Sequence, residues 1–66
     1  MNVFDQPVSI GDVLEVSIEE QGSKGDGIAF VDGLVVFVSD ASPGEKVQIR
    51  IDEVNENCAF AEVWDR

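Results

Sequence analysis

The sequence of 66 residues contains no histidine, no tyrosine and a single cysteine, Cys58. One cysteine leaves no partner for an internal disulfide, and without histidine there are too few ligands for a zinc site. A nucleophilic cysteine would also lack a histidine to activate it. Carboxylates are numerous, but no loop spaces them to converge on a hard cation. The composition therefore argues against an enzyme, and it predicts neither a cofactor nor a bound metal.

Long apolar runs are also missing. No stretch approaches the roughly 20 apolar residues of a membrane span. The first five residues lack the basic start and apolar core of a signal peptide. We therefore expect a cytoplasmic protein with no membrane partner. The chain is long enough for one small domain. A domain of this size buries only about 60% of the surface that its unfolded chain exposes. We expect the protein to be a monomer.

Positive charge is scarce. Four lysines and arginines face fourteen aspartates and glutamates, for a formal net charge of −10. One interpretation is that the protein avoids polyanions, because phosphate binding depends on Lys and Arg. A second is adaptation to a halophilic cytoplasm, since at molar salt the Debye length falls to about 3 Å and like charges on a surface no longer repel. An acidic protein of a mesophile is the alternative to the second interpretation.

The rest of the chain is organised around residues 22–38. Three glycines fall within the six residues 22–27, which predicts a tightly bent loop because glycine tolerates positive φ. Two segments rich in β-formers follow, residues 27–31 and 34–38, and Asp32-Gly33 separates them. Asp-Gly between two such segments is a strong hairpin signal.

Apolar residues alternate with polar ones in three further segments, residues 13–19, 46–52 and 58–64. That period is typical of half-buried strands, and no segment has the pattern of a useful helix. Five short strands separated by turns predict a small closed barrel or sandwich. Residues 1–8 are expected to form a lead-in that lies over the surface, and residues 9–66 the domain.

The outward faces of the last two strands carry basic and aromatic residues. Two registers are open: Arg50 falls opposite Phe60, with Lys46 near Trp64, or Arg50 meets Glu62. Arg and aromatic side chains together form a platform for stacking nucleic-acid bases. The alternative is that Phe60 and Trp64 cover a second small core beneath the lead-in.

Four segments, in order and spacing, resemble the TRAM domain: residues 22–29, 33–38, 43–47 and 57–62. The resemblance covers residues 7–64 and is closest to the small stand-alone archaeal members of the family. It implies an all-β fold, a small five-stranded antiparallel OB-like β-barrel. It also implies a protein that binds RNA, mainly tRNA, and acts as an RNA chaperone in the manner of cold-shock proteins.

The residues and the resemblance together give these candidate RNA-binding residues: Lys24, Phe30, Leu34, Phe37, Lys46, Arg50, Cys58 and Phe60. By resemblance, Phe37 and Phe60 match positions of RNA-facing aromatics. Lys24 keeps the basic residue that the family often has in the glycine loop.

Three of the candidates depart from the family pattern. By resemblance, Leu34 and Cys58 stand where related members often have phenylalanine. Phe30 occupies a position that is commonly basic. Stacking area and positive charge are therefore both reduced relative to the family.

The leading hypothesis is a protein that stacks single-stranded or loop bases of RNA, tRNA included, against Phe37 and Phe60. Lys24, Lys46 and Arg50 would hold the RNA backbone. Unpaired RNA is favoured because its base faces are open. Beyond RNA, the expected partners are ribosomal or RNA-modification proteins. The alternative hypothesis is an acidic protein-interaction module that docks a basic partner such as a ribosomal protein, and single-stranded DNA is a third candidate ligand.

Overall fold

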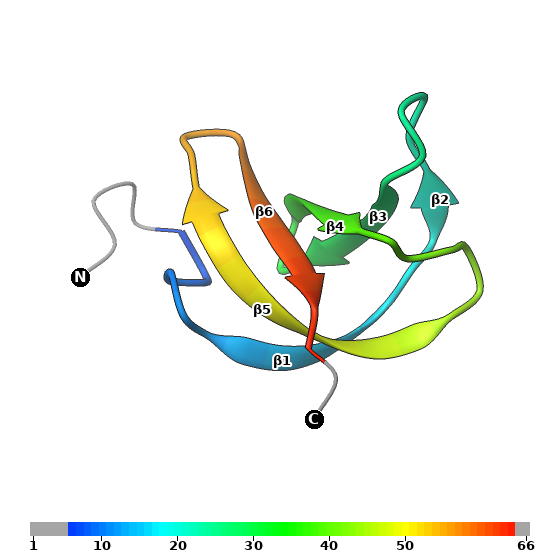
Figure 1. Cartoon of the computed structure of the whole chain (residues 1–66). Helices are drawn as coiled ribbons and strands as arrows, with labels where there is room; N and C mark the ends of the chain where they lie inside the picture. Colours follow the sequence, from blue (N-terminus) through cyan, green and yellow to red (C-terminus); the bar gives the residue numbers. More distant parts are fainter. Residues whose placement is uncertain (1–5, 65–66) are drawn as a thin grey trace.

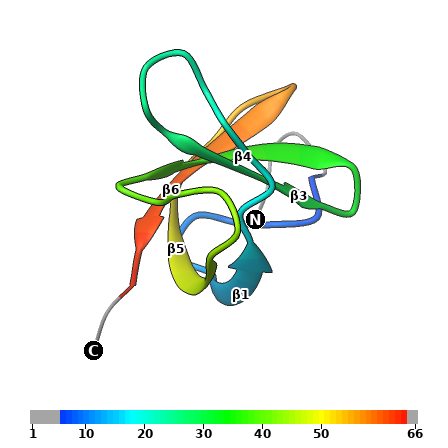
Figure 2. The ribbon, with the colours of Figure 1, turned by 90° about the vertical axis from the view of Figure 1, so that its right-hand side faces the viewer.

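The computed structural model describes residues 6–64, and these form an all-β fold without a helix. The strands follow one another along the chain as β1 Val13–Ser17, β2 Glu20–Gln21, β3 Gly27–Val31, β4 Leu34–Ser39, β5 Lys46–Val54 and β6 Cys58–Val63. All belong to one sheet, in the spatial order β1-β5-β6-β4-β3-β2. The sheet curls strongly on itself, as the two ribbon views show (Figures 1 and 2). The predicted all-β, OB-like fold is confirmed, but within the described residues the sheet stays open between its end strands β1 and β2 and does not form the predicted closed barrel. Two further differences concern the strands.

The first difference is that the predicted strand 13–19 ends at Ser17 and a separate short strand, Glu20–Gln21, follows it. Residues Val13–Ser17 pair with β5, whereas Glu20–Gln21 pair with β3 at the opposite end of the sheet. The change of partner takes place at Ile18 and Glu19: the N–H of Ile18 donates to the Glu45 carbonyl at 2.8 Å, and the N–H of Glu19 donates to the Ile28 carbonyl at 2.8 Å. The polar–apolar alternation continues through this bend, so the sequence pattern alone indicated one strand. The count is therefore six strands instead of five.

The second difference is one parallel pair. The strand β6 lies between β5 and β4, antiparallel to β5 and parallel to β4. All other neighbouring pairs are antiparallel. The parallel pair places residue 60 directly beside residue 37.

The hairpin between β3 and β4 forms where it was predicted. Asp32 and Gly33 adopt positive φ angles of 50° and 87°. Two successive left-handed residues are the geometry of a tight hairpin turn whose twist matches the flanking strands. The turn fixes the register in which Val31 faces Leu34.

The core consists of side chains that project from the concave face of the curled sheet. Its central side chains are Ala29, Val36, Val38, Ile49, Ile51 and Ala59, all of which are completely buried. Val8 is also only 3% exposed, so this part of the lead-in belongs to the core instead of lying over the surface. Residues 1–5 lie outside the described residues. Within residues 6–64, no helix is long and apolar enough to cross a membrane.

Candidate nucleic-acid interface

The convex face of β3, β4 and β6 is unusually apolar. Because successive residues of a strand face opposite sides, burial of Val36 and Val38 turns Phe37 outward. Cross-strand pairing then aligns Ile28, Phe37 and Phe60 in one row across the three strands. A neighbouring row contains Phe30, Val35 and Cys58.

Phe37 and Phe60 form a stacked pair. Their ring centroids are 5.5 Å apart and their planes are inclined by 23°. Neighbouring aromatic rings prefer such offset arrangements, which stabilise both side chains in defined positions. Phe60 keeps 39% of its surface exposed and Phe37 is half-buried, so the pair offers ring surface to a ligand.

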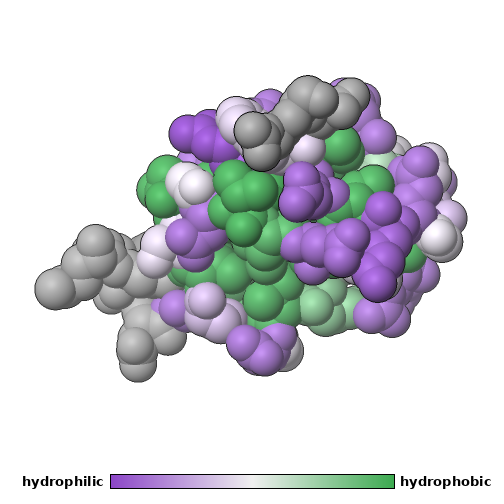
Figure 3. Space-filling model, turned by 90° about the horizontal axis from the view of Figure 1, so that it is seen from below, coloured by the Kyte–Doolittle hydropathy of each residue, from purple (hydrophilic) through white to green (hydrophobic). Residues whose placement is uncertain are grey.

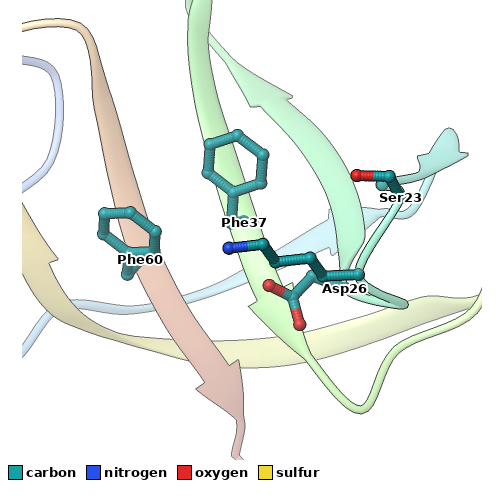
Figure 4. A pocket seen from close by; sticks show the side chains of 6 residues that line it. Ser23, Asp26, Phe37 and Phe60 are labelled. Atoms are coloured by element: carbon teal, nitrogen blue, oxygen red, sulfur yellow. The ribbon is translucent and has the colours of Figure 1, made fainter.

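The glycine loop lies beside these rings and closes a hollow of about 360 Å³. We call this the aromatic hollow, and its lining residues are Gly22, Ser23, Lys24, Asp26, Phe37 and Phe60. Figure 4 shows the two rings on adjacent strands, with Ser23 and Asp26 across from them on the loop. The structure therefore brings together three predicted site residues, Lys24, Phe37 and Phe60.

Close packing holds the glycine loop at this position. The N–H of Gly22 donates to the Asp26 carbonyl at 2.8 Å, which closes the loop on itself. At Gly27 a Cβ atom would lie 2.9 Å from both the Ala41 Cβ and the Ile18 Cγ2. Glycine is thus required there because the backbone approaches its neighbours too closely for any side chain.

Lys24 differs from the two other described lysine and arginine residues. Lys46 Nζ lies 3.9 Å from Glu15 Oε1, and Arg50 Nη1 lies 3.5 Å from Asp52 Oδ1. Within residues 6–64, Lys24 alone among the cations has no carboxylate oxygen within 4.0 Å. Its charge is the one most available to an anionic ligand.

The structure decides between the two registers that the sequence left open. Arg50 lies opposite Glu62, and a bulge between Ile51 and Glu53 sets Phe60 opposite Glu53. Arg50 is therefore a diagonal neighbour of Phe60 on the same face, and its guanidinium carbon lies 5.5 Å from the Trp64 ring centroid. Because Trp64 and Phe60 remain 37% and 39% exposed, the two rings do not form a separate buried core.

The remaining predicted site residues lie elsewhere. Leu34 is only 6% exposed and belongs to the core, so it offers almost no surface to a ligand. Phe30, 45% exposed, and the half-buried Cys58 lie on the convex face in the second row. Lys46 faces Ser17 of β1, at the opposite end of β5 from the turn that precedes β6.

Besides Gly22, two residues of the aromatic hollow, Ser23 and Asp26, were not among the predicted site residues. Both lie within the glycine cluster, which was the available signal in the sequence. Asp26 is half-buried, although most of the acidic residues are exposed. Among residues 6–64, no group of three or more His, Cys, Asp or Glu side chains could hold a metal ion, so Asp26 is not part of one.

A single curled β-sheet with exposed aromatic residues beside a loop that carries a lysine is the OB-like arrangement found in nucleic-acid-binding proteins. Residues 7–64 match the model of the TRAM domain, and the chain belongs to this family. The TRAM domain is an RNA-binding domain, which assigns the chain to the RNA-binding proteins.

Individual relatives agree with this assignment. The chain is 52% identical over 56 residues to the ribosomal RNA large subunit methyltransferase E of Haloarcula marismortui, covering 85% of this chain and 21% of that protein. It is 42% identical over 64 residues to the methyltransferase of the same name from Methanothrix thermoacetophila, covering 97% and 25%. The chain thus spans only about a quarter or less of the curated relatives it matches.

One solved structure is similar to this chain over most of the length of both proteins. The solution structure of a conserved protein of Methanococcus maripaludis superposes with a TM-score of 0.86 at 44% identity. The alignment covers 92% of this chain and 87% of that chain.

Proposed function

We propose that this chain binds unpaired RNA, in tRNA loops or unstructured RNA, by stacking bases on Phe37 and Phe60. Lys24 contacts a phosphate of the same strand, and Arg50 contributes a further charge beside Phe60. By stacking unpaired bases on its aromatic residues, the protein competes with incorrect base pairing within the RNA. It thereby acts as an RNA chaperone of the cold-shock type. It acts as a monomer in the cytoplasm, without catalysis of its own.

The observation that carries this proposal is the aromatic hollow itself. A stacked Phe37–Phe60 pair lies beside a loop that holds the one described cation without a carboxylate partner. Base stacking on aromatic residues contributes roughly 1–3 kcal/mol per base and tolerates any sequence. The names of the methyltransferase relatives, enzymes of ribosomal RNA, agree with an RNA ligand but leave its identity open.

The net charge of −10 supports a halophilic setting for this activity. Each phosphate contact loses value as salt rises, because it depends on counterion release, whereas stacking does not. We therefore expect binding that is nearly independent of salt, or that strengthens as salt screens the acidic surface. A steep loss of affinity between low and molar salt would argue against the proposal.

The test is RNA binding by the wild type and a Phe37→Ala/Phe60→Ala variant in molar potassium chloride. The probe is a fluorescently labelled unstructured RNA, measured by anisotropy. Loss of two stacking surfaces, together roughly 2–6 kcal/mol, should lower affinity by at least about thirtyfold. Circular dichroism checks that the variant retains its β-structure.

Phe30→Ala is the matched control, because Phe30 is also an exposed aromatic on a strand but does not line the aromatic hollow. Its affinity for RNA should stay within about threefold of the wild type. A folded wild type that binds no RNA at any salt concentration would refute the proposed function.

A second candidate function, docking of a basic protein segment, is favoured by a different surface. The β1–β3 seam is an open hollow of about 390 Å³ between two strands that are not paired to each other, and its lining residues are Leu14, Glu15, Val16, Ser17, Glu19, Phe30, Val31 and Asp32. Figure 3 views the molecule from the side of β1 and shows apolar groups gathered between hydrophilic ones. An extended segment can add as a strand to a free sheet edge, and lysines on it would face the three carboxylates.

The probe for this candidate is a synthetic peptide in which lysine and valine alternate, compared with one in which glutamate and valine alternate. Saturable binding of the lysine peptide that is lost in a Glu15→Gln/Asp32→Asn variant would support docking at the β1–β3 seam. Absence of binding at low salt, where attraction between opposite charges is strongest, would reject it.

A further inference from the structure

Asp26 is unexpected in a surface that binds RNA. A carboxylate and a phosphate repel each other, yet Asp26 lines the aromatic hollow together with Lys24 and the two aromatic rings. Within the described residues, its carboxylate accepts no hydrogen bond and has no lysine or arginine nitrogen within 4.0 Å. Both of its oxygens are therefore available to a ligand in the aromatic hollow.

The backbone fixes Asp26 more firmly than Lys24. The Asp26 carbonyl accepts the N–H of Gly22 at 2.8 Å, and the next residue is Gly27, packed against Ile18 and Ala41. Lys24 lies at the tip of the loop, where its side chain is exposed. Figure 4 shows the carboxylate of Asp26 directed from the loop toward the space beside the rings. A side chain that projects from a backbone fixed in this way is suited to discriminate between ligands, whereas the exposed Lys24 can follow a phosphate.

The ionised carboxylate selects what can lie opposite it, because it accepts hydrogen bonds and donates none. Guanine presents two adjacent donors on its Watson–Crick edge, N1–H and the N2 amino group, which match the two carboxylate oxygens. Adenine and cytosine present one amino group beside a ring nitrogen that is itself an acceptor. Uracil presents one N–H between two carbonyl oxygens, which the carboxylate repels.

We propose that Asp26 is a specificity-determining residue that accepts hydrogen bonds from the Watson–Crick edge of an unpaired guanine stacked on Phe37 and Phe60. This inference rests on the proposed function. It adds a base preference to a stacking surface that is otherwise indifferent to sequence. The edge is accessible only in single strands, loops and bulges, so the preference also excludes duplex RNA.

The test uses octauridine RNAs that carry a single central guanosine, adenosine, cytidine, inosine or uridine, in molar potassium chloride. A bidentate contact to a base discriminates by about 1–3 kcal/mol, so the guanosine RNA should bind the wild type about tenfold more tightly than octauridine. Inosine lacks the N2 amino group and should lose most of that preference. Asp26→Asn should reduce the preference to about twofold or less, because an amide oxygen replaces only one of the two acceptors.

Glu56→Gln is the matched control, since it removes the same charge from an exposed side chain in the turn before β6. It should keep the full preference for guanosine. If the wild type binds all five RNAs equally, or if Asp26→Asn keeps the preference, Asp26 does not select guanine. These outcomes leave the proposed function standing provided that Phe37→Ala/Phe60→Ala still lowers RNA affinity by at least about thirtyfold. If that variant binds as well as the wild type, the proposed function itself fails.

Discussion

The aromatic hollow and the β1–β3 seam have nearly the same volume, about 360 and 390 Å³, and each contains exposed aromatic surface. They differ in charge. The aromatic hollow carries one lysine and one carboxylate, Lys24 and Asp26, which do not form an ion pair, whereas the seam carries three carboxylates, Glu15, Glu19 and Asp32, with Lys46 3.9 Å from Glu15. On a chain with a net charge of −10, a lysine without an ion pair is the feature on which we propose the aromatic hollow for RNA and the seam for a basic protein.

The two regions also differ in rigidity. The aromatic hollow is bounded by a loop that packs through Gly27 onto the core, whereas the seam lies between β1, an edge strand, and the part of β3 that extends beyond its pairing with β2. Unpaired strand edges invite another chain, while a fixed loop presents side chains at defined positions. Three substitutions test this contrast, in addition to the variants described above.

Gly27→Ala should have the largest effect. The new methyl group would lie 2.9 Å from the Ala41 Cβ and the Ile18 Cγ2, and overpacking of this kind lowers the free energy of unfolding by about 1–3 kcal/mol. For a domain of this size, the midpoint of thermal unfolding should fall by about 4–8 °C per kcal/mol. RNA affinity should fall as well, because the loop must move away from the rings.

Gly22→Ala is the control for this substitution, since a Cβ atom there would lie 3.6 Å from the Asp26 carbonyl oxygen and 3.8 Å from the Ile28 Cδ1, ordinary contact distances. Its unfolding midpoint should stay close to that of the wild type. Equal stability of both variants would mean that Gly27 does not anchor the loop.

Lys24→Gln should have an intermediate effect, confined to low salt. Each phosphate contact to a single strand makes the slope of log affinity against log salt more negative by about 0.7, so losing this contact should make the slope less negative by that amount. Affinity should fall several-fold at 50 mM salt and remain nearly unchanged at molar salt. Titrations of an unstructured RNA at four salt concentrations measure both quantities.

Lys46→Gln, which removes a lysine already beside Glu15, should change the slope less. A slope that is unaltered by Lys24→Gln, or altered equally by both variants, would show that the unpaired charge of Lys24 does not distinguish the aromatic hollow.

The smallest effect is expected from reversing the charge of the β1–β3 seam with Glu19→Lys/Asp32→Lys. RNA affinity should rise about two- to threefold at low salt and not at molar salt, because exposed charges are screened there. Introduced into Phe37→Ala/Phe60→Ala, the same reversal should not restore RNA binding. If it did, charge alone would separate the two regions, and the stacked pair would not be needed.

Local sequence determined most of the strands and their orientation. In a strand over residues 34–38, Phe37 faces outward if Val36 and Val38 face inward, and the structure buries both valines completely. Asp32-Gly33 specified its hairpin because few residue pairs accept two successive positive φ angles. The period of two residues and the preferences of turn residues are properties of the chain over a few positions, so they can be read without knowing the fold.

Only the tertiary structure decided which strands are neighbours and which side chains meet. The division of residues 13–21 between β1 and β2 depends on two partners, β5 far along the chain and β3 just beyond the glycine loop. The insertion of β6 between β4 and β5 brings Phe60 beside Phe37, and the packing of Gly27 brings Lys24 and Asp26 to the rings. Long-range pairing depends on how several alternating faces fit together, and a slip of one residue would turn a strand's side chains to the other face. The sequence could therefore name aromatic and basic candidates for a site, but it could not show which of them surround the same hollow.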